Sequence, residues 1–281
     1  MSAIGYYNGE IGALERMRIP LLDRASYFGD GCYEACFVRS GVGFALEEHI
    51  CRFYASMEFL RIVPPCSKEE LRSILSRCIR EAAEPNALLY WQASRGTAMR
   101  SHPFPGKDVP SNLTVTVTAK NPPEEFGSVR LMTAEDIRYS MCNVKTLNLL
   151  PNVLTNQRAT EQGLDGAIFV RDGIVTEATH SNVHILKDGV LWTHPADRYI
   201  LDGITRGRLI RLCCELEIPV REEAFRKEAL FTADAVLISA SAAGVRSVLE
   251  IDGRPVGGNA DALVEKIQRA YYRQFRKETE R

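Results

Sequence analysis

A proline-rich segment near the middle of the chain constrains the fold more than any other feature. Residues 120–127 read Lys-Asn-Pro-Pro-Glu-Glu-Phe-Gly. Consecutive prolines cannot continue a helix or a central strand, because each lacks a backbone N–H and has a fixed φ. The pattern of expected elements also changes across this segment. We therefore predict two α+β domains, a small one over residues 1–119 and a larger one over residues 128–281, with a linker over 120–127.

Period-two and helical patterns define the small domain. Strands are expected at residues 4–7, 32–38, 43–46, 87–94 and 112–118. A helix is expected over 47–62, because apolar residues recur there at spacings of three and four. A second helix begins at Ser67, which forms a capping box with Glu70.

The larger domain combines short strands with three helices. Strands are expected at residues 129–133, 144–149, 166–170, 183–187, 190–193 and 235–238. Helices are expected at residues 152–163, 204–217 and 259–278. The sequence contains no internal repeat or heptad array, which excludes a solenoid and a coiled coil.

The composition narrows the class of partner. Of the 281 residues, 45% are hydrophobic and 25% are charged, as in ordinary globular proteins. The net charge of −1 gives no reason to expect nucleic acid, so we expect small-molecule substrates. The sequence has no run of eighteen apolar residues and no basic, then apolar, N-terminal leader. We therefore expect a cytoplasmic protein with no membrane segment.

The cysteines and histidines do not have the spacing of a metal site. None of the eight cysteines lies in a Cys-x-x-Cys pair, and Cys32 and Cys36 are four residues apart in an expected strand. His180 and His184 have no further histidine or carboxylate at ligand spacing. We expect free thiols in a reducing compartment and no metal.

Lys145 and Glu177 carry the most specific chemical signal. Apolar residues flank Lys145, which predicts a partly desolvated amine that is available to attack an aldehyde. Glu177 follows a turn at residues 171–173. An amine that forms a Schiff base and a carboxylate that keeps a pyridinium nitrogen protonated are the minimum set for pyridoxal phosphate chemistry. The alternatives are a surface lysine and a solvated loop glutamate.

Three features could bind a phosphate group. Thr205 begins a helix after a glycine, so its hydroxyl and the N–H groups of the first turn could hold an anion, although an ordinary helix cap is the alternative. Residues 239–244 form a loop of small residues after an apolar strand. Arg52 lies opposite the apolar stripe of its helix and could supply a cation, with simple exposure as the alternative.

Arg100 and His102 lie two residues apart in the loop that follows the strand expected at 87–94. Such a pair can converge on a substrate carboxylate through charge-assisted hydrogen bonds. The alternative is a basic loop without a function.

Taken in order, these residues resemble the class IV aminotransferases, the fold-type IV pyridoxal phosphate enzymes. The resemblance covers nearly the whole chain and rests on residues 28–34, 48–52, 145–150, 177–182 and 201–205. Within the class, the Arg-x-His sequence in the loop at 90–105 is similar to that of the D-amino-acid-specific branch. The resemblance implies a small N-terminal α/β domain and a larger C-terminal α/β domain with a pseudo-barrel.

The resemblance also implies a role for each candidate. Lys145 would bind pyridoxal 5'-phosphate covalently and move the substrate α-proton, and Glu177 would face the pyridine nitrogen. The phosphate would be bound by Arg52, Ile204, Thr205 and Ser241. Leu201 would pack on the ring, with Arg138 and Ser181 near its polar edge. The substrate carboxylate would be bound by Tyr33, Arg100 and His102, the last two from a second subunit, which implies a homodimer.

Three positions depart from the family pattern. Cys32 occupies a position where an aliphatic side chain is usual. His180 occupies a position beside the cofactor where a small residue is usual. Ala240 replaces a hydroxyl-bearing residue of the phosphate loop, which leaves its backbone N–H as the remaining donor.

The implied reaction is transamination between a D-amino acid, such as D-alanine or D-glutamate, and a 2-oxo acid, such as pyruvate or 2-oxoglutarate. A branched-chain L-amino-acid aminotransferase shares every motif except the Arg100-x-His102 loop. A lyase of the aminodeoxychorismate type shares Lys145 and Glu177 but lacks that loop. A binding module without catalysis is the remaining alternative, and the presence of the lysine and the glutamate argues against it.

Overall fold

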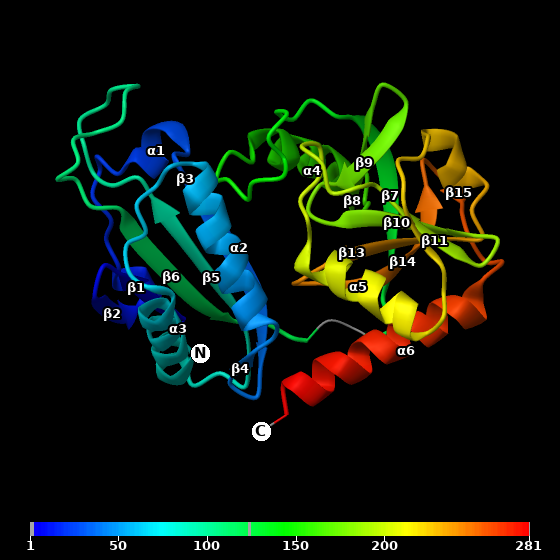
Figure 1. Ribbon diagram of the computed structural model, residues 1–281, viewed down its shortest axis with the longest axis horizontal. Coiled ribbons are helices and arrows are strands. Elements are labelled where there is room, and N and C mark those ends of the chain that lie inside the picture. The colour runs from blue at the N-terminus through cyan, green and yellow to red at the C-terminus, as the bar shows by residue number, and fades with distance from the viewer. Residues whose placement is uncertain (1–2, 123–124, 281) are drawn as a thin grey trace. The chain divides into compact units, whose positions relative to one another are not determined.

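The computed structural model describes residues 3–122 and 125–280, and the chain within it forms two compact units (Figure 1). Unit 1 contains residues 3–122, 144–148 and 277–280, and unit 2 contains residues 125–143 and 149–276. The predicted domain boundaries differ from these units at residues 120–127, 144–148 and 277–280, and they stay a prediction. Residues 123 and 124 of the predicted linker lie outside the described residues.

Six strands form an antiparallel sheet in the described part of unit 1, in the order β2-β1-β6-β5-β3-β4. The strands are β1 (Ile4–Tyr7), β2 (Glu10–Ala13), β3 (Gly31–Arg39), β4 (Val42–Gly43), β5 (Asn86–Ser94) and β6 (Asn112–Ala119). The helices are η1 (Leu14–Arg16), α1 (Arg24–Phe28), α2 (Leu46–Phe59) and α3 (Lys68–Ala82). Helix α2 packs on β3 and α3 packs on β6, so the apolar core lies between the helices and the sheet.

The core of unit 1 follows from the alternation of side chains along each strand. Cys32 and Cys36 of β3 are fully buried, as is Trp91 of β5. They pack in one cluster with Phe53 and Met57 of α2. Each large side chain buried in this way stabilises the unit by about 1.5–3 kcal/mol.

The sheet of unit 2 has nine strands in the described residues and closes on itself. The strands are β7 (Ser128–Glu135), β8 (Gly166–Arg171), β9 (Ile174–Ala178), β10 (Asn182–Lys187), β11 (Val190–Thr193), β12 (Val220–Glu222), β13 (Ala235–Ala240), β14 (Gly244–Ile251) and β15 (Arg254–Pro255). Eight of them follow the order β12-β11-β10-β13-β14-β7-β8-β9, and β15 pairs with β14. Strand β9 also pairs with β10, where Glu177 lies opposite Asn182. This closure confirms the predicted α+β fold with a pseudo-barrel.

Helices α4 (Leu150–Glu161), α5 (Ile204–Glu215) and α6 (Asp261–Glu278) and the short helix η2 (Lys227–Phe231) complete unit 2. Helix α4 packs on β8, and α5 packs on β13. A cluster of buried apolar side chains from β8, β10, β13 and β14 fills the interior. Helix α5 therefore lies beside the strand that precedes the loop at residues 241–243.

Locally determined elements agree with the sequence. The strand at residues 4–7 and the helix that follows Ser67 are present as predicted. The Ser67 hydroxyl accepts a hydrogen bond from the Glu70 N–H at 3.2 Å, and the Glu70 carboxylate accepts one from the Ser67 N–H at 2.7 Å.

The strand predicted at 43–46 is wrong beyond Gly43, because Ala45 adopts a left-handed conformation with φ of 55° and α2 begins at Leu46.

The strand predicted at residues 144–149 is also wrong, because this segment is irregular. Its contacts explain the course of the chain. Strand β4 pairs with β3 at Val38 and Arg39, which leaves the edge of β3 at residues 31–33 open to another partner. The Lys145 carbonyl accepts a hydrogen bond from the Tyr33 N–H at 2.9 Å, and the Leu147 N–H donates to the Gly31 carbonyl at 3.1 Å.

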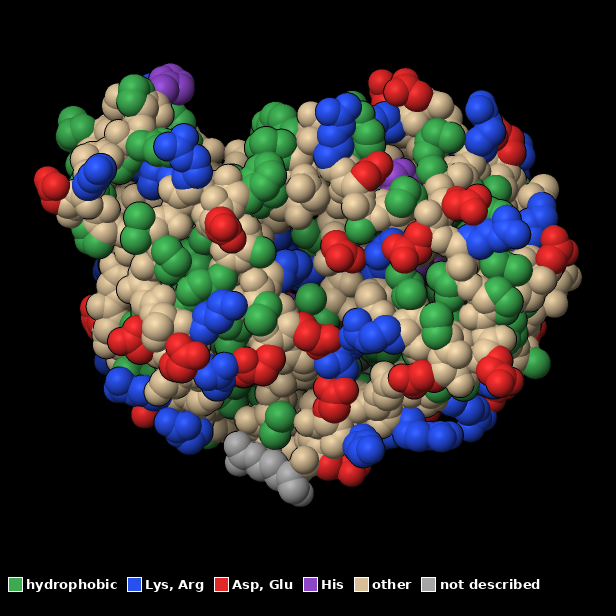
Figure 2. All heavy atoms as spheres, viewed as in Figure 1, with side chains coloured by type: hydrophobic (Ala, Val, Ile, Leu, Met, Phe, Trp, Pro, Cys, Tyr) green, Lys and Arg blue, Asp and Glu red, His purple; other side chains and the backbone are tan. Residues whose placement is uncertain are grey.

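Charged side chains of opposite sign are interspersed over the face shown in Figure 2. Within the described ranges, we find no helix that is long and apolar enough to cross a membrane. The eight cysteines, all of which lie in the described part of the chain, are free thiols. The described residues include no cluster of three or more His, Cys, Asp or Glu side chains arranged to hold a metal.

Candidate active site

The candidate residues are distributed over the two units. Unit 1 carries Tyr33, Arg52, Arg100, His102 and Lys145, and unit 2 carries Arg138, Glu177, Ser181, Leu201, Ile204, Thr205 and Ser241.

Lys145 lies beside Tyr33. The irregular segment places the Lys145 Nζ 4.4 Å from the centroid of the Tyr33 ring, within the range of a cation–π contact. Tyr33 in turn stacks on Tyr90 of β5, with ring centroids 5.5 Å apart. Lys145 is half-buried rather than fully exposed. The structure therefore brings the predicted nucleophile and one predicted carboxylate-binding residue together on one edge of β3.

Glu34 follows Tyr33 in β3 and points to the opposite face of the sheet, into the core of unit 1. Its Oε1 accepts a hydrogen bond from the Arg52 Nε at 2.7 Å, and its Oε2 accepts one from the Arg52 Nη2 at 2.9 Å. The His49 Nδ1 lies 2.7 Å from Oε2. Arg52 is thus not simply exposed on α2, because its guanidinium is bound by a carboxylate that has no solvent exposure.

The ionisation of this cluster follows from burial and charge. Burial alone would raise the pKa of Glu34, but the guanidinium of Arg52 and the hydrogen bond from His49 lower it to about 2. Burial lowers the pKa of His49, so its imidazole is neutral at pH 7 and donates its Nδ1–H to Glu34. We did not predict this role of Glu34. The available signal was a glutamate at a core-facing position of an apolar strand.

Arg100 and His102 share one aromatic neighbour. The Arg100 guanidinium lies 5.1 Å from the Phe28 ring centroid, and the His102 ring lies 5.3 Å from the same ring. Both side chains are exposed. Buried Arg24 anchors their loop, because its Nη1 donates to the Ser101 carbonyl at 2.6 Å.

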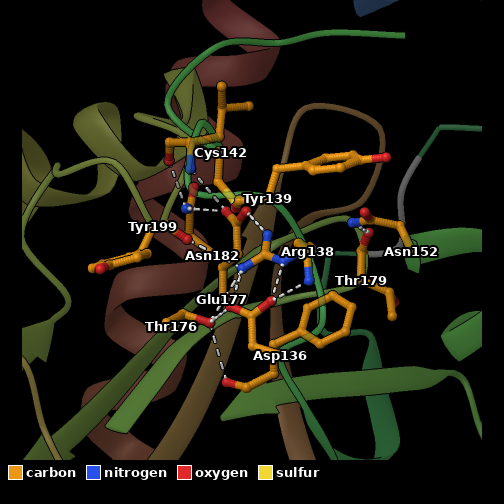
Figure 3. A network of polar contacts seen from close by, with 12 residues as sticks. Asp136, Arg138, Tyr139, Cys142, Asn152, Thr176, Glu177, Thr179, Asn182 and Tyr199 are labelled. Carbon is orange, nitrogen blue, oxygen red and sulfur yellow. Dashed lines mark hydrogen bonds and ion pairs between the residues drawn. The ribbon is translucent and has the colours of Figure 1, made fainter. Parts of the chain in front are cut away.

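Glu177 lies on β9 and is 8% exposed, which excludes the solvated loop residue considered from the sequence. The predicted turn before it is present, since Asp172 and Gly173 have positive φ values of 51° and 79° between β8 and β9. This hairpin directs the glutamate into the network of polar contacts shown in Figure 3.

Three groups hold the Glu177 carboxylate. Its Oε1 accepts a short hydrogen bond from the Arg138 Nη1. Its Oε2 accepts hydrogen bonds from the Leu201 N–H at 3.0 Å and the Asn182 Nδ2 at 3.3 Å. Asn182 also donates to the Leu201 carbonyl at 2.8 Å. Leu201, predicted to pack on the cofactor ring, is therefore tied through its backbone to the residue predicted to face the ring nitrogen.

Leu201 leads directly into the predicted phosphate-binding turn. Helix α5 begins at Ile204, and Gly203 is its N-cap residue, so Thr205 is not the cap. A side chain at Gly203 would collide with the Asn182 Oδ1, which explains why glycine is needed here although its φ is ordinary. Gly203 has no side chain that could accept hydrogen bonds from the N–H groups of the first turn of α5. These N–H groups are therefore suited to bind an acceptor from outside the chain, such as a phosphate.

The remaining candidates lie in connections between strands. Ser181 is buried in the turn between β9 and β10, where its carbonyl accepts from the Ala178 N–H at 2.7 Å. The exposed His180 has its Nδ1 3.1 Å from the Ser181 Oγ. Ser241 lies in the turn after β13, which is closed by a hydrogen bond of 3.1 Å from the Ala243 N–H to the Ala240 carbonyl.

The family model described as amino-transferase class IV matches residues 31–251. The chain belongs to the class IV aminotransferases, and it is a pyridoxal-phosphate-dependent enzyme of fold-type IV. A D-alanine aminotransferase from Bacillus licheniformis is 36% identical over 97% of each chain. A D-alanine aminotransferase from Staphylococcus epidermidis is 39% identical over 95% of each chain.

Solved structures of the same fold are similar over nearly the whole chain. The branched-chain amino acid aminotransferase of Escherichia coli has a TM-score of 0.90 and 25% identity, with 100% of this chain and 97% of that chain covered. The branched-chain amino acid aminotransferase of T.th., complexed with N-(5'-phosphopyridoxyl)-L-glutamate, has a TM-score of 0.89 and 25% identity, with 99% and 95% covered.

Proposed function

We propose that this chain transfers the amino group of a D-amino acid, D-alanine or D-glutamate, to a 2-oxo acid such as pyruvate or 2-oxoglutarate. The observation that carries the proposal is the 36% and 39% identity to D-alanine aminotransferases over nearly the full length of each chain. The Arg100-x-His102 loop, which separates the D-specific from the branched-chain interpretation, supports the same assignment.

The residues fit pyridoxal 5'-phosphate by the chemistry of their donors and acceptors. When bound, this group supplies an aldehyde that reacts with amines and a ring that withdraws electrons once its nitrogen is protonated. The Glu177 carboxylate, oriented by Arg138, Asn182 and the Leu201 N–H, would hold the proton on that nitrogen. The Leu201 side chain would pack against the ring, and Ser181 would lie near its polar edge.

Cationic and N–H donors would bind the phosphate group. We assign this role to the Arg52 guanidinium, the N–H groups of Ile204 and Thr205 in the first turn of α5, and Ser241. Arg52 suits a bidentate contact because Glu34 fixes the plane of its guanidinium.

Lys145 is the proposed catalytic residue. Its Nζ would link to the cofactor and, when released by the substrate amine, would take the α-proton of the substrate. The contact with Tyr33 supports this role, because an aromatic ring on one side restricts the directions that the amine can take.

Tyr33, Arg100 and His102 are the proposed ligands of the substrate carboxylate. We propose a homodimer in which Arg100 and His102 act in the site of the partner subunit. Large apolar side chains near this loop support such an interface, since Met99 is 75% exposed, Leu21 is 85% exposed and Phe104 is 51% exposed. We also propose a cytoplasmic location, which the free thiols of the chain support.

A branched-chain L-amino-acid aminotransferase is the second candidate, because the two solved structures described above carry that name. Incubation with pyridoxal phosphate, 2-oxoglutarate and either D-alanine, L-alanine or L-leucine separates the candidates when the new 2-oxo acid is measured by chromatography. D-glutamate is assayed with pyruvate instead. We expect products from D-alanine and D-glutamate. Product from L-leucine without product from D-alanine would replace the D-specific assignment with the branched-chain one.

A further inference from the structure

The arginine that holds Glu177 is itself held by a second carboxylate. The Arg138 Nε donates to the Asp136 Oδ1 at 2.9 Å, and the Arg138 Nη2 donates to the Asp136 Oδ2 at 2.9 Å. The Arg138 backbone N–H also donates to Oδ1, at 3.1 Å. One edge of the guanidinium is therefore bound by Asp136 while its Nη1 is directed to Glu177 (Figure 3).

Asp136 is built into the protein rather than placed at its surface. Its side chain has no solvent exposure. The Thr176 hydroxyl donates to Oδ2 at 2.9 Å, and an Arg171 nitrogen lies 3.2 Å from Oδ1. Burial alone would raise the pKa of Asp136, but the hydrogen bonds and charge of Arg138, with Arg171, lower it. Such burial of a charge is costly unless the partners are well placed, so the arrangement invites a functional explanation.

The chain of charges has a consequence for Glu177. With Asp136 in place, the guanidinium keeps one orientation, and its charge is shared between two carboxylates. Without Asp136, the whole charge would act on Glu177 and on any cation near it, because Coulomb interactions are strong in a buried site. A protonated ring nitrogen beside Glu177 would then be less favourable, since a nearby like charge disfavours the charged form.

We propose that Asp136 is a positioning residue that sets how strongly Glu177 binds the protonated ring nitrogen, acting through Arg138. The proposal rests on the proposed function, in that it takes Glu177 to face that nitrogen. Residue 136 itself would not touch the cofactor.

A binding experiment on the cofactor-free protein tests this directly. The dissociation constants of pyridoxal phosphate and of its analogue with carbon in place of the ring nitrogen are measured by equilibrium dialysis. The aldehyde and phosphate are the same in both ligands, so their contributions cancel in the ratio. We expect Asp136→Asn to reduce the preference for pyridoxal phosphate over the analogue at least tenfold, which is about 1.4 kcal/mol.

Asp252→Asn is the matched control. The Asp252 carboxylate, like that of Asp136, accepts hydrogen bonds from a threonine and pairs with a cation. It accepts from the Thr133 N–H and hydroxyl at 2.7 Å each, and it lies 3.3 Å from the Lys227 Nζ. This variant should leave the preference unchanged. If Asp136→Asn weakens the two ligands equally, or weakens neither, the inference is overturned and the role of Asp136 is structural.

Thr176→Val is the second variant, in case Asp136→Asn does not fold. It keeps every charge but removes the hydroxyl that donates to Asp136, so the preference should fall in the same direction, by about two- to fivefold. An unchanged preference would count against the inference. Turnover of D-alanine by the wild type is measured separately. If D-alanine is not a substrate, the binding experiment still tests the role of Asp136. A wild type that binds the two ligands equally well overturns the inference outright.

Discussion

The Glu34 carboxylate binds the Arg52 guanidinium through parallel hydrogen bonds of 2.7 and 2.9 Å inside the apolar core of unit 1. Such a pair is costly to bury and more costly to break, because the remaining partner is left as an uncompensated charge. Glu34 and Tyr33 lie on opposite faces of β3. The edge of this strand therefore hydrogen-bonds to the segment of Lys145, while its buried face holds the guanidinium of Arg52.

Replacing Glu34 by Gln should lower the free energy of unfolding at pH 7 by about 3–5 kcal/mol, because the variant lacks the negative charge that faces Arg52 and one of the two acceptor oxygens that Arg52 and His49 share. Denaturant titration of the two proteins checks this. The control is Glu47→Gln, which removes an exposed partner of Arg72 at 2.5 Å and should cost less than about 1 kcal/mol. Equal costs for the two variants would contradict the prediction.

The same cluster predicts sensitivity to acid. The pKa of Glu34 is about 2 in the folded chain against an ordinary value of 4.5, so the unfolded chain takes up the proton first. The stabilisation is therefore complete above about pH 4.5 and is lost as the pH falls toward 2. The unfolding free energy of the wild type should fall over this range, and that of Glu34→Gln should fall less steeply. Parallel curves would argue against the assigned charge state.

Lys145→Ala should abolish transamination while the protein stays folded, because the nucleophile and the proton carrier are the same amine. Loss of general acid–base catalysis alone is worth about 10²–10⁴-fold. The measurements are 2-oxo acid production and circular dichroism. Lys187→Ala, which removes an exposed lysine from β10, should retain activity. Turnover by Lys145→Ala close to that of the wild type would refute the assignment.

Arg100→Ala should lower kcat/KM for D-alanine at least about tenfold, because the substrate carboxylate loses a charged partner. The affinity for pyridoxal phosphate should not change, since Arg100 is not among the residues proposed to bind it. Lys107→Ala removes the same charge from an exposed position in the same connection between β5 and β6 and serves as the control. A similar loss in the two variants would point to general electrostatics rather than to a specific carboxylate contact.

Gly203→Ala should destabilise the protein by about 1–3 kcal/mol, because the added methyl group collides with Asn182. Displacement of Asn182 should also weaken cofactor binding through the loss of its contacts with Glu177 and Leu201. Gly207 is the fourth residue of α5, where an added methyl group has room, and Gly207→Ala should instead be stabilising by about 0.5–1 kcal/mol. Thermal unfolding and cofactor titration distinguish the two.

Sequence patterns predicted the features whose causes are local. The capping box of Ser67 and Glu70 needs residues three apart, and the hairpin before Glu177 needs Asp172 and Gly173 side by side. The fold class was predicted from the order of the sequence motifs, which is a property of the family. It was not predicted from the physical properties of any one segment. The positions of the predicted site residues in strands, turns and helices can be read from the structure, whereas their chemical roles stay proposals.

Relationships between distant segments were not predictable in the same way. The segment at 144–148 has an apolar pattern typical of a strand, but its backbone bonds to the edge of β3 that β4 leaves open. Glu34 and Arg52 are eighteen residues apart, and Asp136 and Thr176 are forty apart. Their partnership depends on which strands become neighbours, and this is decided by the tertiary fold.

The pairing of Glu177 with Asn182 joins β9 to β10 and so closes the sheet of unit 2. The residue pair that closes the sheet therefore includes Glu177, which is also the residue proposed to bind the ring nitrogen. A ligand bound by Glu177 would stabilise the pairing of β9 with β10 and so raise the free energy needed to separate these two strands locally. The Ala178 N–H donates to the Ser181 carbonyl in the turn between β9 and β10. Amide hydrogen exchange at Ala178 should therefore slow on cofactor binding. Exchange along the outer strand β12 should not.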